Sequence, residues 1–172
     1  MAFFYPTWSA ERITDICGAW LQEKGIKALL LDIDNTLTEH NSPIVLPEVA
    51  EWLESRKQEG VFMILVSNNS AERVAPFARA LGLPFCAKAQ KPLWVGFRRA
   101  ATELGVPLKQ CAVIGDQIFT DIIGANLSRM PSVLLQPLAC EQNEPLIQFK
   151  RILEKPLRAA ILKQQRRKQD DT

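Results

Sequence analysis

Short apolar runs alternate with longer amphipathic stretches along most of this chain. The apolar runs lie at residues 26–33, 61–67, 84–89, 111–116 and 131–137. Their length and their turn-forming flanks are typical of strands that are buried on both faces of a sheet. Helical spacing of apolar positions is found at residues 46–60, 70–81, 92–104, 120–129 and 144–155, and a first helix is predicted from Ser9 to about Lys24.

Strands that alternate with helices in this way predict βαβ units, and therefore a parallel sheet. Because such connections are right-handed, we expect helices on both faces of the sheet. The predicted fold is a three-layer, Rossmann-like α/β domain with no cap domain. We expect residues 1–172 to form one domain, with a helical lead-in over 1–27 and a basic tail over about 156–172.

Composition narrows the class of protein. The net charge is only +2, so we expect no nucleic-acid partner. The charge is uneven, because residues 150–172 hold eight Lys or Arg against three acids and carry +5, which leaves −3 for the rest. The four cysteines lie far apart without a CxxC pair, which argues against zinc and disulfides. No apolar run approaches the roughly 20 residues of a membrane span, and no signal-like leader is seen, so we expect a cytoplasmic protein.

Polar and charged residues follow each of the first four apolar runs. Asp32 and Asp34 follow the first, Ser67 and Asn68 the second, Lys91 the third, and Asp116 with Asp121 the fourth. Ligand sites of open α/β sheets lie outside the carboxyl ends of the strands. We therefore expect acids, a lysine and a hydroxyl to meet at one edge of the sheet.

Such a set of residues favours phosphoryl transfer. Neighbouring carboxylates repel one another, and a hard divalent cation such as Mg²⁺ relieves that repulsion. A carboxylate can attack phosphorus, while a lysine and a hydroxyl bind the charged phosphoryl oxygens. A single Asp after a strand is more often a turn or a helix cap, so the prediction depends on the whole ordered set.

The same residues resemble the four motifs of the haloacid dehalogenase-like (HAD) phosphatases. The segments "DIDNT", "ILVSNN", "AQKP" and "VIGDQIFTD" resemble motifs I to IV in order, in the class IIIA form. The closer resemblance is to the YqeG-like branch and to phosphatidylglycerophosphate phosphatases. Gln117 departs from the family pattern, because it stands where a second acid often follows Asp116.

The resemblance implies a role for each motif residue. Asp32 would be the nucleophile and a Mg²⁺ ligand, and Asp34 the general acid and base, with its backbone carbonyl on the metal. Ser67 and the backbone amide of Asn68 would bind the phosphoryl group, and Lys91 would orient Asp32. Asp116 and Asp121 would complete the metal shell, the latter directly or through water.

The substrate is open at this stage. Without a cap the site would accept a bulky ester, and the resemblance implies hydrolysis of phosphatidylglycerophosphate at a membrane surface, as a peripheral protein on the inner face. The alternatives are a soluble phosphatase for a sugar or nucleotide phosphate, and a binding module without turnover. An oligomeric neighbour could also supply a lid.

Two segments leave their role open. The N-terminal aromatics around Phe3 and Trp8 suit either a bilayer interface or packing under the sheet, and the basic tail suits either anionic lipid or a solvated, partly disordered end. His40 is interpreted as an ordinary loop residue.

Overall fold

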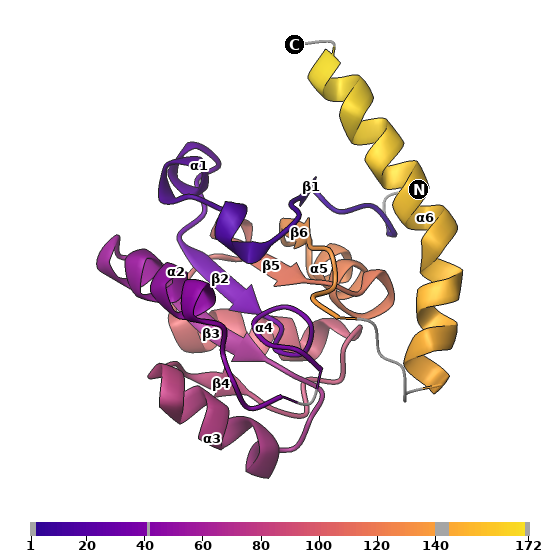
Figure 1. Cartoon of the computed structure of the whole chain (residues 1–172). Helices are drawn as coiled ribbons and strands as arrows, with labels where there is room; N and C mark the ends of the chain where they lie inside the picture. The colour runs from indigo at the N-terminus through magenta and orange to yellow at the C-terminus, as the bar shows by residue number, and fades with distance from the viewer. Residues whose placement is uncertain (1–2, 41, 140–144, 171–172) are drawn as a thin grey trace.

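Six parallel strands form the centre of the molecule, in the order β1-β6-β5-β2-β3-β4 (Figure 1). This computed structural model describes residues 3–40, 42–139 and 145–170, without the side chains of 145–147, 150 and 165–170. The strands are β1 Trp8–Ser9, β2 Ala28–Leu31, β3 Phe62–Val66, β4 Phe85–Cys86, β5 Cys111–Gly115 and β6 Ser132–Leu134.

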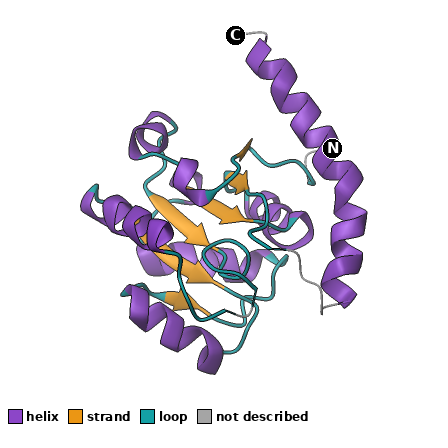
Figure 2. Ribbon diagram, in the orientation of Figure 1, coloured by secondary structure: helices purple, strands orange, loops and turns teal. Residues whose placement is uncertain are grey.

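Helices cover both faces of this sheet (Figure 2). They are α1 Gly18–Glu23, α2 Pro47–Gln58, α3 Ala71–Leu81, α4 Trp94–Leu104, α5 Ile123–Ser128 and α6 Pro145–Asp170. On one face Leu29 and Leu31 pack in a core with Trp52 of α2; on the other, Leu30 packs in a core with Phe97 of α4. Because side chains alternate along a strand, β2 supplies side chains to both cores. The predicted three-layer parallel fold is confirmed.

The predicted helix from Ser9 to Lys24 is wrong over most of its length. This segment contains β1, a 3₁₀ turn (Ile13–Asp15) and only then the short α1. Trp8 pairs in parallel with Val133, which adds an edge strand that local spacing does not reveal. The carbonyl of Ile16 accepts hydrogen bonds from Trp52 Nε1 at 2.7 Å and from Arg56 Nη1 at 3.0 Å, so it is not available to a continuous helix.

The C-terminal segment also departs from the prediction. We expected a helix to end near Lys155 and left open whether the basic tail beyond it is ordered, but α6 continues to Asp170. Its residues Leu157 and Ile161 pack in a small apolar cluster with Tyr5 and with Ile118. This tertiary packing explains why the helix persists beyond its strongest sequence pattern. Glu144, the expected first residue of the helix, and residues 171–172 lie outside the described part of the chain.

The predicted helix at 120–129 is divided in two. A five-residue π-helix, η3 (Ile118–Ile122), precedes α5, which begins at Ile123. Single π turns are frequent at functional sites, and this one carries Asp121.

The intervals between the motif residues hold little besides the core elements. The described residues between Asp34 and Ser67 form α2, β3 and an irregular stretch, and those between Ser67 and Lys91 form α3, β4 and short loops. Neither interval contains a cap domain in the part of the chain that the structure describes. None of the described helices combines the length and the apolarity that crossing a membrane would require.

Candidate active site

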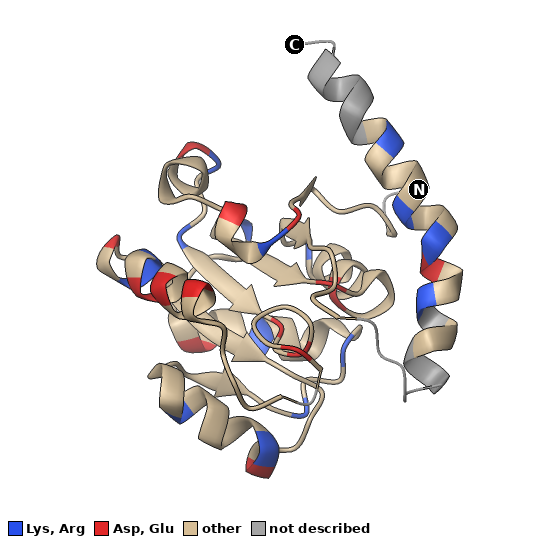
Figure 3. Cartoon of the chain, in the orientation of Figure 1, with Lys and Arg blue, Asp and Glu red and all other residues tan. Residues whose placement is uncertain are grey.

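The carboxyl ends of the central strands bring the motif residues together. Asp32 follows β2, Ser67 follows β3 and Asp116 follows β5 directly, whereas Lys91 arrives through the loop after β4. Figure 3 shows acidic and basic positions gathered beyond the arrowheads of these strands. Parallel pairing of β2 with β3 and with β5 explains why residues distant in sequence share one edge.

Lys91 links two of the acids. Its Nζ donates to Asp32 Oδ1 at 2.5 Å and to Asp121 Oδ1 at 2.7 Å, and all three side chains are nearly inaccessible to solvent. Burial alone would lower the pKa of Lys91, but Asp121 and Asp32 outweigh it and raise that pKa above its usual range. Lys91 is therefore a fixed positive charge beside Asp32.

Asp32, Asp116 and Asp121 form a cluster, since one carboxylate oxygen from each lies within 4.8 Å of the others. Burial raises the pKa of Asp32 to about 8, with Asp121 and Asp116 adding to the effect and Lys91 opposing it. Burial likewise raises the pKa of Asp116 to about 7, against the lowering influence of Arg151. Three buried acids so close together call for positive charge.

Two further hydrogen bonds hold Asp121 in the cluster. Its Oδ2 accepts from the backbone N–H of Gln117 at 3.1 Å and from Thr120 Oγ1 at 3.4 Å. Gly115 is required beside it, because a Cβ at that position would lie 2.4 Å from Asp121 Cγ. The glycine of the "GDQIFTD" motif thus makes room for its last acid, and Gln117 contributes through its backbone.

The cluster fits a divalent cation. Asp116 is fully buried, and its Oδ1 has no hydrogen-bond partner among the described residues. A buried, unpaired carboxylate oxygen is costly, and a cation bound by this atom would remove the cost. All the donor atoms are carboxylate oxygens, which suit hard cations such as Mg²⁺.

Asp34 occupies a more open position. Its Oδ1 accepts from Arg73 Nη2 at 3.1 Å and lies 3.7 Å from His40 Nδ1, and its Oδ2 accepts from Asn69 Nδ2 at 3.1 Å. A cavity of about 130 Å³, lined by Asp34, Asn69 and Arg73 among others, opens beside it. The sequence interpretation missed Arg73 and treated His40 as an ordinary loop residue, because neither lies in a motif.

Ser67 and Asn68 complete the edge. The Ser67 side chain is buried, and its Oγ accepts from the backbone N–H of Asn69 at 3.1 Å. The Asn68 side chain bonds to the backbone of Lys91 in both directions, at 2.7 Å from Lys91 N and 3.1 Å from its carbonyl. Asn68 therefore fixes the position of Lys91. Only the backbone amide of Asn68 is left for the predicted phosphoryl contact. Thr36 Oγ1 donates to Asp32 Oδ2 at 3.4 Å.

Helix α6 also reaches the site, which the sequence interpretation missed. Arg151 donates to the Asp116 carboxylate and, at 2.9 Å, to its carbonyl, which also accepts from Arg158. Glu154 is fully buried between them, 3.5 Å from each guanidinium, and accepts from the backbone N–H of Phe119 at 3.2 Å. The spacing of Arg151, Glu154 and Arg158 on one helical stripe is the signal that could have revealed this contact.

The charges of the seven ionisable side chains in and beside the cluster do not sum to zero. Four carboxylates, those of Asp32, Asp116, Asp121 and Glu154, meet the cations of Lys91, Arg151 and Arg158. With all seven groups ionised, one negative charge would be left over within this described group, and in the metal-free protein the raised pKa of Asp32 allows a proton to neutralise it. A bound cation would compensate both the excess negative charge and the unpaired Asp116 oxygen.

Comparisons with known proteins agree with a phosphoryl-transfer site. Residues 39–128 match the model of a family described as haloacid dehalogenase-like hydrolase. The "Probable phosphatase YqeG" of Bacillus subtilis (strain 168) is 35% identical over 159 residues, which cover 92% of each chain. A chloroplastic phosphatidylglycerophosphate phosphatase 1 of Chlamydomonas reinhardtii is 30% identical over 77% of this chain, but the match spans only 53% of that protein.

The fold is similar to solved structures as well. A crystal structure of an uncharacterized protein from Listeria monocytogenes serotype 4b superimposes with a TM-score of 0.57, at 23% identity, over 69% of this chain and 84% of the other. At that identity the similarity concerns the fold alone.

Proposed function

Because this chain belongs to the haloacid dehalogenase-like hydrolase family, as a phosphatase of its YqeG-like branch, we propose that it hydrolyses phosphate monoesters through a phosphoryl group carried on Asp32. The observation that supports this most strongly is the position of Lys91 Nζ, which bridges Asp32 and Asp121 beside the unpaired Asp116 oxygen. A nucleophilic carboxylate next to a fixed cation and a cation-binding cluster is the arrangement that phosphoryl transfer requires.

The first half-reaction uses the two motif I acids. A carboxylate oxygen of Asp32 attacks phosphorus, the bond from phosphorus to the ester oxygen breaks, and Asp34 gives its proton to the leaving oxygen. Asp34 suits this role because it lies at the mouth of the site beside the cavity, held by Asn69 and Arg73. Lys91 keeps Asp32 oriented and neutralises charge on the phosphoryl oxygens.

The second half-reaction restores the enzyme. Asp34, now a carboxylate, takes a proton from water, the water oxygen attacks the phosphorus of the aspartyl phosphate, and the carboxylate of Asp32 is released with inorganic phosphate. The hydroxyl of Ser67 and the backbone amide of Asn68 would bind the phosphoryl oxygens throughout.

We propose Mg²⁺ as the metal, held by the carboxylates of Asp32, Asp116 and Asp121 and by the backbone carbonyl of Asp34. When bound, it supplies positive charge that stabilises the oxygens of the phosphoryl group in transfer. Arg151 and Arg158 position Asp116 for this task through contacts with its carboxylate and its carbonyl.

For the substrate we propose phosphatidylglycerophosphate, hydrolysed to phosphatidylglycerol by a protein in peripheral contact with a membrane. Two observations support this choice: the similarity to a protein named for that activity, and an edge of the sheet without a cap in the described residues. An open edge admits a headgroup that is still anchored in a bilayer. The competing substrate is a soluble sugar or nucleotide phosphate, for which the same catalytic residues would serve.

A substrate panel tests this proposal. Purified protein with Mg²⁺ is offered phosphatidylglycerophosphate in micelles, sugar phosphates and nucleotides, and phosphate release is measured, with Asp32→Asn as the control. We expect the lipid ester to be preferred and the control to be inactive. Preference for a soluble ester would replace the lipid assignment, and full activity of Asp32→Asn would refute the nucleophile. If no ester is hydrolysed, the chain would be a binding module.

A further inference from the structure

Helix α6 has two contrasting faces, and only the inner one is covered. Arg151, Glu154 and Arg158 face the site, and Ile161 packs on the core. On the outer face three large apolar side chains are exposed: Phe149 is 60% accessible, Ile152 59% and Leu153 46%. Exposed large apolar residues grouped on one helix face indicate an interaction surface.

We propose that this outer face of α6 docks on an anionic lipid bilayer. The proposal deepens the proposed function, and it rests on that function where lipid hydrolysis is the readout. The docking face is defined by Phe149, Ile152 and Leu153, with the exposed Lys155 and Lys163 as its charged members. An amphipathic helix that combines apolar side chains with lysines lies in the plane of a membrane interface.

Charge favours an anionic lipid surface as the occupant. The only acid among the described side chains of α6 is Glu154, which is buried and paired with two arginines. Figure 3 shows α6 with several basic bands and one acidic band. The exposed face is thus apolar and cationic, and each basic residue near an anionic membrane contributes about 1 kcal/mol. A second copy of the chain would bring the same cations into a symmetric interface, where they would repel.

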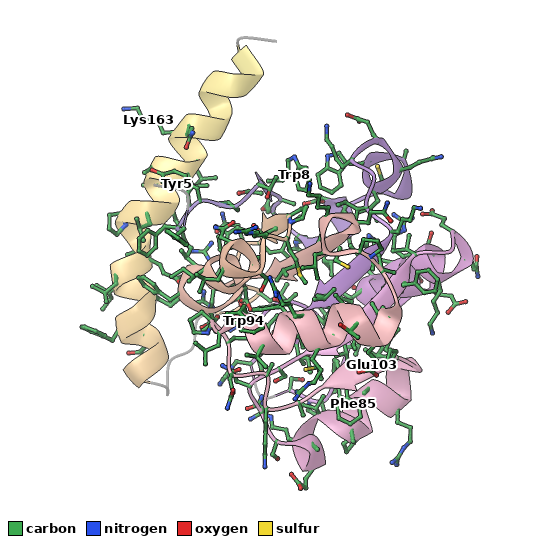
Figure 4. All side chains as sticks on the ribbon, turned by 180° about the vertical axis from the view of Figure 1, so that it is seen from behind. Tyr5, Trp8, Phe85, Trp94, Glu103 and Lys163 are labelled. Atoms are coloured by element: carbon green, nitrogen blue, oxygen red, sulfur yellow. The ribbon has the colours of Figure 1, made fainter. Side chains whose placement is uncertain are left out.

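The N-terminal segment packs beside the same helix and carries exposed aromatic residues of its own. Phe3 and Phe4 are 53% and 41% exposed, and the Phe4 ring meets Phe119 edge-on with centroids 6.2 Å apart. The backbone N–H of Phe119 in turn donates to Glu154 of α6, and Figure 4 places Tyr5 beside α6. Aromatic residues next to a docked helix are favoured at the interface.

Docking on this face would hold the domain at the lipid surface, close to the active site. The inner face of the same helix contacts Asp116, so the helix that meets the membrane also borders the candidate metal cluster. Docking would thus keep the candidate metal cluster within about one helix diameter, roughly 10 Å, of the lipid surface.

Vesicle co-sedimentation tests the docking face. Vesicles of phosphatidylcholine with and without an anionic phospholipid are mixed with the wild-type protein, with the triple variant Phe149→Ser, Ile152→Ser, Leu153→Ser, and with Phe62→Ser. Phe62 is 53% exposed at the start of β3 and serves as the matched control. We expect wild type and Phe62→Ser to bind the anionic vesicles. The triple variant should bind roughly 1,000-fold more weakly, since each of the three large side chains contributes about tenfold on burial.

A second pair of measurements separates this inference from the proposed function. Turnover of a soluble ester, p-nitrophenyl phosphate, should be unchanged in the triple variant, which also shows that it folds. Vesicle binding that is absent in the wild type, or unaffected by the triple substitution, would overturn the docking face while leaving the phosphatase proposal standing. Vesicle binding by a protein that hydrolyses no ester would overturn the phosphatase proposal while leaving the docking face standing. A wild-type dimer that becomes monomeric in the triple variant, without lipid binding, would reassign the face to self-association.

Discussion

Replacing Arg151 with methionine removes the cation that α6 places on the Asp116 carboxylate. Breaking a buried ion pair by removing one partner costs about 3–5 kcal/mol, because the other charge is left unpaired. The Arg151 side chain is 15% exposed, and Arg158 still binds the Asp116 carbonyl, so we expect the lower end, about 3 kcal/mol. For a domain of this size, that loss lowers the melting temperature by about 6–12 °C.

The assay is unfolding by heat and by urea, with and without Mg²⁺. In metal-free protein the full loss should be seen, whereas saturating Mg²⁺ should reduce it, because a cation on Asp116 would replace part of the missing charge. Lys155→Met is the matched control, since Lys155 is exposed on the same helix, and its effect should stay within about 0.5 kcal/mol. An Arg151→Met variant as stable as this control would refute the contact between α6 and Asp116.

Three further predictions concern the cluster itself. Lys91→Met should lower kcat by at least about 100-fold, as measured by steady-state turnover, because Asp32 loses its oriented cation; a rate near wild type would contradict its role. In the folded protein the pKa of Asp32 is about 8 and that of Asp116 about 7, both above the ordinary value of 3.8. Between about pH 4 and about pH 8 the folded metal-free protein therefore binds more protons than the unfolded chain. Its stability should therefore fall as the pH rises from about 4 to about 8, and urea midpoints in EDTA that rise over this range would contradict the assignment. EDTA should stop ester hydrolysis and added Mg²⁺ should restore it, and turnover that survives full chelation would count against a metal at Asp116.

The central strands and the motif acids could be predicted because their signals are local. A buried apolar run identifies β2 or β5 from a few residues, and parallel topology places the residues that follow, Asp32 and Asp116, at one edge. The sequence does not specify which side chain bonds to which. The Asn68 side chain holds the Lys91 backbone, a contact that depends on the path of the loop after β4.

Most of the missed features depend on contacts between distant parts of the chain. Strand β1 exists because Trp8 pairs with Val133, far along the sequence, so its two residues carry no strand signal of their own. Arg151 contacts Asp116 from 35 residues away, and a basic segment looks solvated until its acidic partner is located. Tertiary packing of Leu157 and Ile161 also explains why α6 continues past Lys155 instead of ending there.

Trapping the phosphorylated enzyme tests the central claim most directly. Protein in steady-state turnover is quenched with borohydride, which reduces an aspartyl phosphate to homoserine, and the peptides are mapped by mass spectrometry. We predict homoserine at position 32, dependent on both ester and Mg²⁺, and its absence from the Asp32→Asn protein. Undiminished turnover with no modified residue at position 32, or with the modification at another carboxylate, would contradict the account.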